Sequence, residues 1–320
     1  MRVAFFGSSR FSCLVLDAIK QSAHTVTVVV TQPDQPKGRR MALCPTPLCN
    51  HASLDGLPVL KPENVKNNPG FRRELMAQHP EALLVASFGQ IISKKVLALT
   101  EWPLNVHPSA LPKLRGASPV RTAILQGLKE TACCIMRMTP RLDDGDVMLR
   151  ASLAIPLDWN HEQLETVLGE LGGRLAVKAL DQVNAGTACF YPQDHGTATY
   201  CALYHRKDTV IDWTRSALEL YNFVRAWDPD IGASTRLPDE RRLKVWATSI
   251  EEPPESLCPD NECREPGTIV AASKKALWVA CGSGTLRLVE VQPENKGRMN
   301  VASFLAGANL KAGQLLRAAN

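Results

Sequence analysis

The sequence predicts an α/β protein: a Rossmann-like, doubly wound and mostly parallel sheet, followed by a small OB-like β-barrel domain. Residues 3–30 give an apolar strand, a tight turn, an amphipathic helix and a β-branched strand, which is how a doubly wound domain opens. Beyond residue 208, short β-rich runs are separated by Gly, Pro and Asn turns, as in a small barrel. The 320 residues, 45% of them hydrophobic, leave room for about two domains.

In the first half, strands and helices are expected to alternate. The expected strands are 3–6, 25–31, 58–60, 82–86, 104–107, 132–138 and 147–155. The expected helices are 11–19, 71–78, 119–126 and 161–183, the last with an apolar stripe that includes Leu164 and Leu168 and is expected to be core. The first turn, Gly7-Ser8-Ser9-Arg10, lacks the glycines that let a backbone approach a pyrophosphate. The sequence therefore argues strongly against an NAD site.

The second half is expected to be a separate domain. Residues 189–207 have little apolar periodicity and are expected to link a catalytic domain, 1–188, to a barrel, 208–320. The barrel would open with a helix over 216–226 and contain strands at 243–247, 268–270, 276–281 and 286–291. Partly open barrels of this kind commonly bind nucleic acid.

Charge and cysteine usage restrict the class of protein. The net charge is +5, and residues 1–188 hold all of the excess, with 21 Lys and Arg against 16 Asp and Glu. This balance permits a polyanionic partner without requiring one. The ten cysteines follow no metal-ligand pattern, so we expect reduced thiols in a cytoplasmic protein without a metal site. No run of about 18 apolar residues is present, and we expect no membrane contact.

The stretch Asn105-Val106-His107 is the first candidate for chemistry. Two residues apart on a strand, Asn105 and His107 point to one face. One is an amide that never titrates, and the other is the side chain that ordinarily titrates near neutrality. Downstream, Asp143 lies in a glycine-containing turn before another apolar run. A carboxylate beside a histidine orients the ring and favours its charged form.

The segment from Gln32 to Pro47 is the second candidate. Prolines at both ends and Gly38 near its middle argue against one regular element running through it. Its tip carries three cations: Lys37, Arg39 and Arg40. Taken alone, this pattern is more typical of a solvated basic loop than of a binding site.

Three motifs together resemble the formyltransferases that use 10-formyltetrahydrofolate. The likeness extends from the first strand to Pro293-Glu294-Asn295-Lys296-Gly297, and it is strongest to members that formylate methionyl-initiator tRNA. The motifs are Asn105-x-His107-x-Ser109-x-Leu111-Pro112, then Arg115-Gly116-Ala117-x-Pro119, and then Leu142-Asp143-x-Gly145-Asp146.

The resemblance implies a role for each matching residue. It makes Asn105, His107 and Asp143 catalytic and assigns the basic loop, Lys37, Arg39 and Arg40, to the acceptor end of the tRNA. It also implies a tRNA-binding barrel. We expect a monomer, and formyl transfer from folate to an amine requires no metal. The folate would lie near Ser109, Ala110, Leu111 and Pro112, with its pterin against the backbone of Gln90, Ile92, Arg141 and Leu142. Ala110 and Asp144 depart from the usual family residues.

Three alternatives stay open on the sequence. A glycinamide ribonucleotide formyltransferase shares the Asn-His-Asp core but lacks the second domain in the family pattern. Sugar-nucleotide formyltransferases share the core and add a second domain, and the basic, proline-rich loop favours tRNA over them. A nucleic-acid-binding protein on a decayed enzyme scaffold is a different class, which the intact Asn, His and Asp residues argue against.

Overall fold

The computed structural model describes residues 1–37, 41–257 and 264–319, and the chain divides into two compact units. The first unit contains residues 1–120, 130–155 and 164–203. The second contains residues 121–129 and 156–163 together with the chain from residue 204 onward. In the part of the chain that the structure describes, no helix is long and apolar enough to span a membrane.

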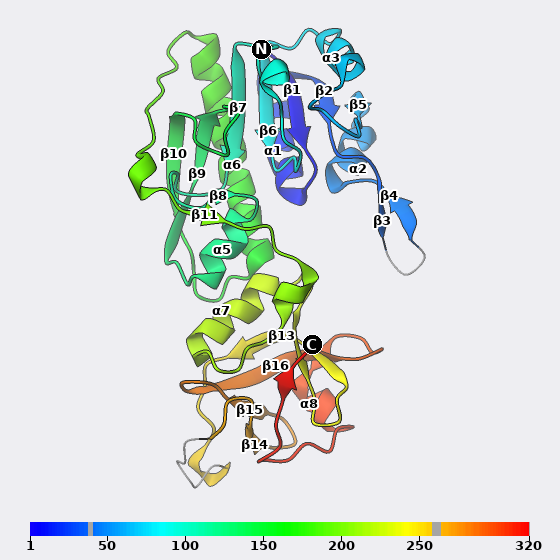
Figure 1. Ribbon diagram of the computed structural model, residues 1–320, viewed down its shortest axis with the longest axis vertical. Coiled ribbons are helices and arrows are strands. Elements are labelled where there is room, and N and C mark those ends of the chain that lie inside the picture. Colours follow the sequence, from blue (N-terminus) through cyan, green and yellow to red (C-terminus); the bar gives the residue numbers. More distant parts are fainter. Residues whose placement is uncertain (38–40, 258–263, 320) are drawn as a thin grey trace. The chain divides into compact units, whose positions relative to one another are not determined.

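A seven-stranded sheet forms the centre of the first unit (Figure 1). Five strands are parallel, whereas β9 is antiparallel to β7 and β10 is antiparallel to β9. The predicted doubly wound, mostly parallel sheet is therefore confirmed. In spatial order the strands are β10 (Val147–Ala154), β9 (Glu130–Arg137), β7 (Trp102–His107), β6 (Ala82–Ala86), β1 (Arg2–Gly7), β2 (Thr25–Val30) and β5 (Val59–Leu60).

Helices follow the strands of the first unit. Helices α2 and α3 each begin with a capping residue, Thr or Asn, followed by a proline in the first turn. The cap accepts a hydrogen bond from one of the free N–H groups at the start of the helix, and proline lacks an N–H. A core on one face of the sheet joins Phe6 and Leu83 to Phe71 of α3 and Val96 of α4. The helices that begin or lie in this unit are α1 (Arg10–Lys20), α2 (Pro47–Leu54), α3 (Pro69–Met76), α4 (Lys94–Leu97), α5 (Pro119–Leu125) and α6 (His161–Asn184).

Helix α6 approaches the sheet and α1 through glycines. A Cβ on Gly172 would lie 2.7 Å from Cγ1 of Val106 on β7, and a Cβ on Gly173 would lie 2.6 Å from Cβ of Ala18 on α1. Both distances are too short for real side chains. Because Val106 points toward α6, Asn105 and His107 point to the opposite face of the sheet.

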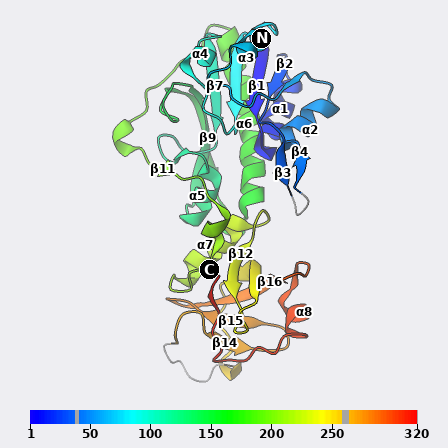
Figure 2. The same cartoon turned by 45° about the vertical axis from the view of Figure 1, so that its right-hand side comes forward.

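The segment from Gln32 to Pro47 forms its own small sheet. Strands β3 (Gln35–Lys37) and β4 (Ala42–Cys44) pair antiparallel and stay outside the seven-stranded sheet. Figures 1 and 2 show this hairpin extending away from the strands of that sheet. Its tip lies outside the described residues.

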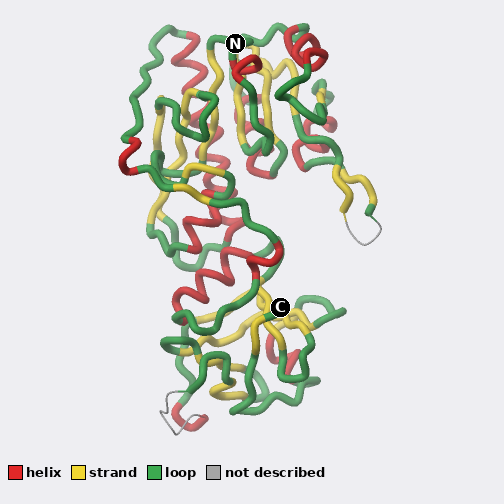
Figure 3. Tube along the Cα trace, in the orientation of Figure 1, coloured by secondary structure: helices red, strands yellow, loops and turns green. Residues whose placement is uncertain are grey.

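The chain after α6 runs back along the first unit. Figure 3 draws it mostly as loop, beside edge strand β10, where Tyr191 bridges Val147. After the short 3-10 helix η1 (His195–Thr197), β11 (Tyr200–Cys201) pairs in parallel with β8 (Arg115–Gly116). Residues 189–203 thus belong to the first unit, although they show little apolar periodicity in the sequence.

The second unit is a curled antiparallel sheet accompanied by short helices, in agreement with the predicted OB-like barrel. Its core includes Trp213, Phe223 and Trp227. The strands run β14-β15-β16-β13-β12-β18, and β17 pairs with β16. Their bounds, with those of the helices, are η2 (Arg206–Thr209), α7 (Ala217–Trp227), β12 (Ala233–Arg236), β13 (Arg242–Ser249), η3 (Glu255–Leu257), β14 (Ile269–Ala272), β15 (Leu277–Ala280), β16 (Thr285–Pro293), β17 (Met299–Asn300), α8 (Val301–Leu305) and β18 (Arg317–Ala318).

Candidate active site

The polar side chains of β7 lie where parallel strands end. Strands β6 and β7 are parallel and in register, so the turn after β6 and His107 share one edge of the sheet. In open α/β sheets ligands gather outside this carboxyl edge. Asn105 is 8% exposed and His107 is 4% exposed. Within the described residues the Asn105 amide has no hydrogen-bond partner, so it is available to a ligand.

The loop after β7 closes over the same face. Leu111 packs against Cys134 and Met136 of β9, which are the cross-strand partners of His107 and Asn105. The loop is tied internally, because the Ser109 hydroxyl donates to the carbonyl of Lys113 at 2.7 Å. The predicted folate-binding segment, residues 109–112, therefore lies beside the polar side chains of β7.

Two backbone groups hold the histidine and the aspartate. His107 Nε2 lies 3.0 Å from the carbonyl oxygen of Leu114. Since a carbonyl only accepts, Nε2 carries a proton and Nδ1 is the nitrogen that faces Asp143. The amide of Gly116 donates to Asp143 Oδ2 at 2.8 Å. Nδ1 of His107 and Oδ2 of Asp143 are 3.8 Å apart, and the aspartate side chain is 15% exposed.

The cysteines beside β7 are not nucleophiles. Burial raises the pKa of the Cys134 thiol to about 11, and burial raises that of Cys133 still further. The Cys134 thiol donates to the carbonyl oxygen of Ser109 at 3.1 Å. Reactive cysteines are thiolates, whereas burial keeps these two thiols protonated near neutral pH.

The predicted pterin contacts lie in several environments. Gln90 is held by backbone groups, since its Oε1 accepts from Val65 and its Nε2 donates to the carbonyl of Pro62, both at 3.2 Å. Ile92 is buried in the core beside α4. Arg141 and Leu142 are exposed. The contacts found in the structure do not join Gln90 or Ile92 to His107 or Asp143.

A depression of about 670 Å³ lies elsewhere at the strand ends. Gln90 lines it, together with residues at the base of the β3–β4 hairpin, whereas Asn105, His107 and Asp143 do not. Asp144, which departs from the usual family residue, contacts Thr139 and Arg141. Its carboxylate accepts from the Thr139 hydroxyl and lies 3.9 Å from the Arg141 guanidinium.

The cations predicted at the tip of the hairpin lie outside the part of the chain that the structure describes. Arg39 and Arg40 lie outside the described residues, as does the side chain of Lys37. Two exposed apolar side chains lie on the described part of the hairpin: Met41, just before strand β4, and Leu43 within it. The described flank of the hairpin is therefore apolar.

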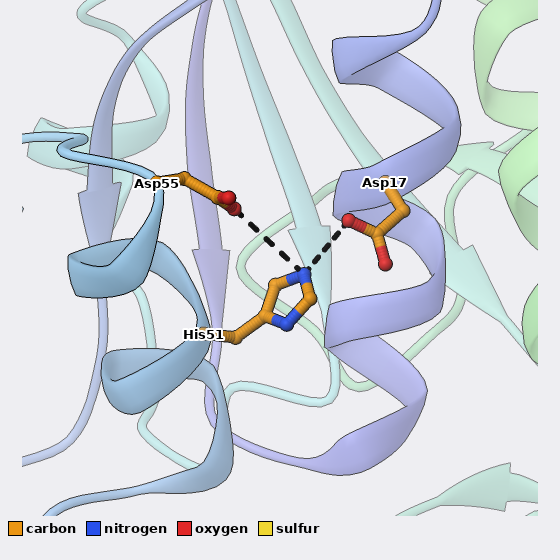
Figure 4. Close-up of side chains that lie close together, drawn as sticks. All are labelled: Asp17, His51 and Asp55. Atoms are coloured by element: carbon orange, nitrogen blue, oxygen red, sulfur yellow. Dashed lines mark hydrogen bonds and ion pairs between the residues drawn. The ribbon is translucent and has the colours of Figure 1, made fainter.

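A second polar cluster lies between α1 and α2 (Figure 4). Asp17, His51 and Asp55 place one ligand atom each within 4.8 Å of the others. Lys20 occupies the same cluster, with Nζ 3.3 Å from Asp17 Oδ1 and 2.5 Å from Asp55 Oδ2. Its hydrogen bond lowers the pKa of Asp55. An ammonium already compensates these carboxylates, and we interpret the cluster as an ion-pair network between two helices.

Two family models match the chain and define its class. The model "Formyl transferase" matches residues 1–180, and the model "Formyl transferase, C-terminal domain" matches residues 205–309. A solved N-formyltransferase from Helicobacter canadensis, in complex with folinic acid and dTDP-3-aminofucose, has a TM-score of 0.63 at 15% identity, covering 91% of this chain and 98% of that one. The protein is thus a two-domain enzyme of formyl transfer.

Curated relatives narrow the class. The methionyl-tRNA formyltransferase of Bacillus subtilis is 37% identical over 317 residues, covering 98% of this chain and 97% of the relative. That of Symbiobacterium thermophilum is 38% identical over 319 residues, covering 98% and 94%. The chain belongs to the methionyl-tRNA formyltransferase family, which confirms the resemblance seen in its motifs.

Proposed function

We propose that this enzyme transfers the formyl group of 10-formyltetrahydrofolate to the amino group of methionyl-initiator tRNA, giving formylmethionyl-tRNA for translation initiation. The observation that carries the proposal is the match along nearly the whole chain to curated methionyl-tRNA formyltransferases at 37–38% identity. The cluster of Asn105, His107 and Asp143 at the carboxyl edge of the sheet supports it.

The proposed chemistry is acyl transfer without a covalent enzyme intermediate. The neutral amine attacks the formyl carbon, an oxyanion develops, and a proton moves from the attacking nitrogen to the leaving nitrogen of the folate. Asn105 donates from its unpartnered amide to the oxyanion. One such donor is typically worth about 3–4 kcal/mol of transition-state stabilisation. The side-chain donors of this chain supply that stabilisation, and the proposal assigns no step to a metal.

His107 and Asp143 complete the proposed mechanism. With Nε2 bonded to Leu114, the Nδ1–H of a cationic His107 is the second donor to the oxyanion. Nδ1 lies 3.8 Å from the Asp143 carboxylate, a separation at which an oxygen atom beside both groups, and not between them, can accept from the Nδ1–H. Asp143 supports the cation and relays the proton through water, a role worth roughly a hundred- to ten-thousand-fold.

The remaining assignments extend the proposal to the rest of the chain. Residues 109–112, Gln90, Ile92, Arg141 and Leu142 would hold the folate, and the buried packing of Leu111 beside His107 supports the first of these. Lys37, Arg39 and Arg40 would meet the acceptor end of the tRNA. We assign the chemistry to a catalytic domain, residues 1–188, and tRNA binding to a C-terminal domain, residues 208–320, with residues 189–207 as the linker. We further propose that the enzyme is monomeric and cytoplasmic.

The experiment that tests the proposal is incubation with 10-formyltetrahydrofolate and charged initiator tRNA, followed by detection of formylmethionine. We expect formylation of methionyl-initiator tRNA and none with His107→Ala. A parallel reaction contains a dTDP-amino sugar in place of the tRNA. Formylation of the sugar and not of the tRNA would overturn the proposed acceptor.

A further inference from the structure

Gln193, in the segment that follows α6, makes four hydrogen bonds at the proposed site. It is 7% exposed. Its Nε2 donates to the carbonyl oxygens of Asp143 at 2.9 Å and of Gly145 at 2.6 Å. Its Oε1 accepts from Nε and Nη2 of Arg115 at 3.2 and 2.7 Å. Only one orientation of the amide satisfies all four bonds, because carbonyls only accept and a guanidinium only donates.

These bonds join the two backbone segments that hold the reacting groups. Arg115 lies between Leu114, whose carbonyl accepts from His107, and Gly116, whose amide donates to Asp143. Asp143 itself has a φ of +48°, in the left-handed region that a side chain rarely adopts. A turn in this conformation needs external bonds to stay fixed, and Gln193 supplies them on both sides of residue 144.

The partner of Gln193 is a buried cation. Arg115 is 2% exposed, and no carboxylate in the described ranges lies within 4 Å of its guanidinium. Its side-chain partners are Gln193 and, at 3.0 Å, Nδ1 of His195. A buried charge is costly unless its donors are bonded, so the orientation of Arg115 depends on the Gln193 amide.

We propose that Gln193 is a positioning residue, which sets the separation of His107 and Asp143 by bonding the Asp143 turn to Arg115. This inference rests on the proposed function, because it assumes that His107 and Asp143 act on one formyl group. Misplacing a catalytic group by about 1 Å can cost on the order of a hundredfold in rate. The segment that follows α6 therefore supports the proposed catalytic residues through Gln193.

The test uses two near-isosteric variants of the full chain. Gln193→Met keeps the side-chain length and loses all four bonds. Gln193→Glu keeps the acceptor for Arg115 and puts a carboxylate against the carbonyls of Asp143 and Gly145. Gln182→Ala, on helix α6, is the control. We expect both Gln193 variants to lower kcat at least about tenfold, with the KM for methionyl-tRNA within about twofold of the wild type.

Two further readouts separate positioning from folding. Calorimetry with a reduced folate measures the fraction of protein with an intact site. If Gln193 acts by positioning, the stoichiometry of folate binding stays near one while kcat falls. If the variant misfolds, the stoichiometry and kcat fall together. The pH dependence of kcat in the Gln193 variants should also shift relative to that of the wild type. If one variant does not fold, the other decides. An unchanged kcat in a folded variant, or a loss that follows the stoichiometry, would overturn the inference. A wild-type enzyme inactive on methionyl-tRNA would overturn the proposed function instead.

Discussion

Nδ1 of His107 and Oδ2 of Asp143 are 3.8 Å apart, too far for a hydrogen bond and close enough for an ion pair. Each group is anchored from behind by a backbone group, at 3.0 Å and 2.8 Å respectively. Catalytic hydrogen bonds are often long without substrate and shorten in the reacting complex. The backbone anchors thus hold the two side chains close together without a direct hydrogen bond between them.

Removing any one of Asn105, His107 and Asp143 should lower turnover at least about a hundredfold, because each substitution by alanine removes charge stabilisation or its support. The fold should survive, since the side chains lie at a strand edge. Initial rates and thermal melts of each variant check this. Asn67→Ala, at an exposed loop, is the control. Near-normal turnover in a folded variant would remove that residue from the mechanism.

The protein should bind a reduced folate and not NAD. The first turn has no room for a pyrophosphate beside its backbone, because a Cβ at Gly7 would already meet Ser12 at 2.5–2.6 Å. The hydroxyl of Ser9 also occupies the start of α1, where it accepts from Ser12 N–H. Calorimetry with both ligands is the measurement. Tight binding of NAD without folate binding would contradict the assignment of the site.

Arg39→Ala should weaken formylation of charged tRNA strongly and leave folate affinity unchanged. Arg39→Lys should restore part of the loss, because the charge returns without the forked donor geometry. Each phosphate contact removed should flatten the log–log salt dependence of tRNA binding by about one unit. Arg174→Ala, an exposed arginine on α6, is the matched control. Equal losses of tRNA formylation and folate affinity would show instead that the hairpin supports the folate site.

Gly173→Ala should destabilise the first unit. Alanine favours a helix over glycine by about 1 kcal/mol, but its Cβ would lie 2.6 Å from the Cβ of Ala18. Overpacking typically costs about 1–3 kcal/mol, so we expect a net loss of about 1 kcal/mol in the free energy of unfolding. Denaturant unfolding measures it. Gly70→Ala should be neutral, and adding Ala18→Gly to Gly173→Ala should recover stability; a stable single variant would refute the close packing.

Asp230→Asn should weaken the second unit in a pH-dependent way. Hydrogen bonds from His161, then from Arg121, lower the pKa of Asp230 from 3.8 to about 2. The carboxylate therefore contributes stability above pH 3.8, and that stability is lost as the pH falls toward 2. The full shift would correspond to about 2 kcal/mol. Because the side chain is 46% exposed, solvent screening reduces this to about 1 kcal/mol.

The check is the difference in unfolding free energy between the Asp230→Asn variant and the wild type at pH 6 and at pH 3. The difference should shrink at the lower pH. Asp239→Asn, at an exposed pair with Arg241, should have the smaller effect. A difference that grows on acidification would have the wrong sign for a lowered pKa.

Apolar periodicity predicted much of the fold. The strands around Phe5, Leu84 and Val106 have near-continuous buried runs, which is the pattern of a parallel sheet covered on both faces. Strand β12 was missed because its Ala-Ser-Thr-Arg sequence has no large apolar residue, although three of its four residues are buried. The face of α6 that packs closely against β7 and α1 was not predicted either, because its contacts are made by glycines, which contribute nothing to apolar periodicity.

The site was predicted in part. The two-residue spacing of Asn105 and His107 on a strand gave their common face, and the Asp143 turn lies beside them. Gln193 was missed because it works through hydrogen bonds to backbone carbonyls, which leave no periodic trace. The sequence did hold an indication of such a role. The segment after α6 has no apolar periodicity but carries Gln, Asp and His, whose polar groups need hydrogen-bond partners.

The second unit takes residues 121–129 and 156–163 from the middle of the chain, and Leu125 packs against its core. A C-terminal fragment that began anywhere between the two matched family regions would lack residues 121–129 and 156–163, which belong to its own compact unit. Such a fragment would have to fold without Leu125 against its core.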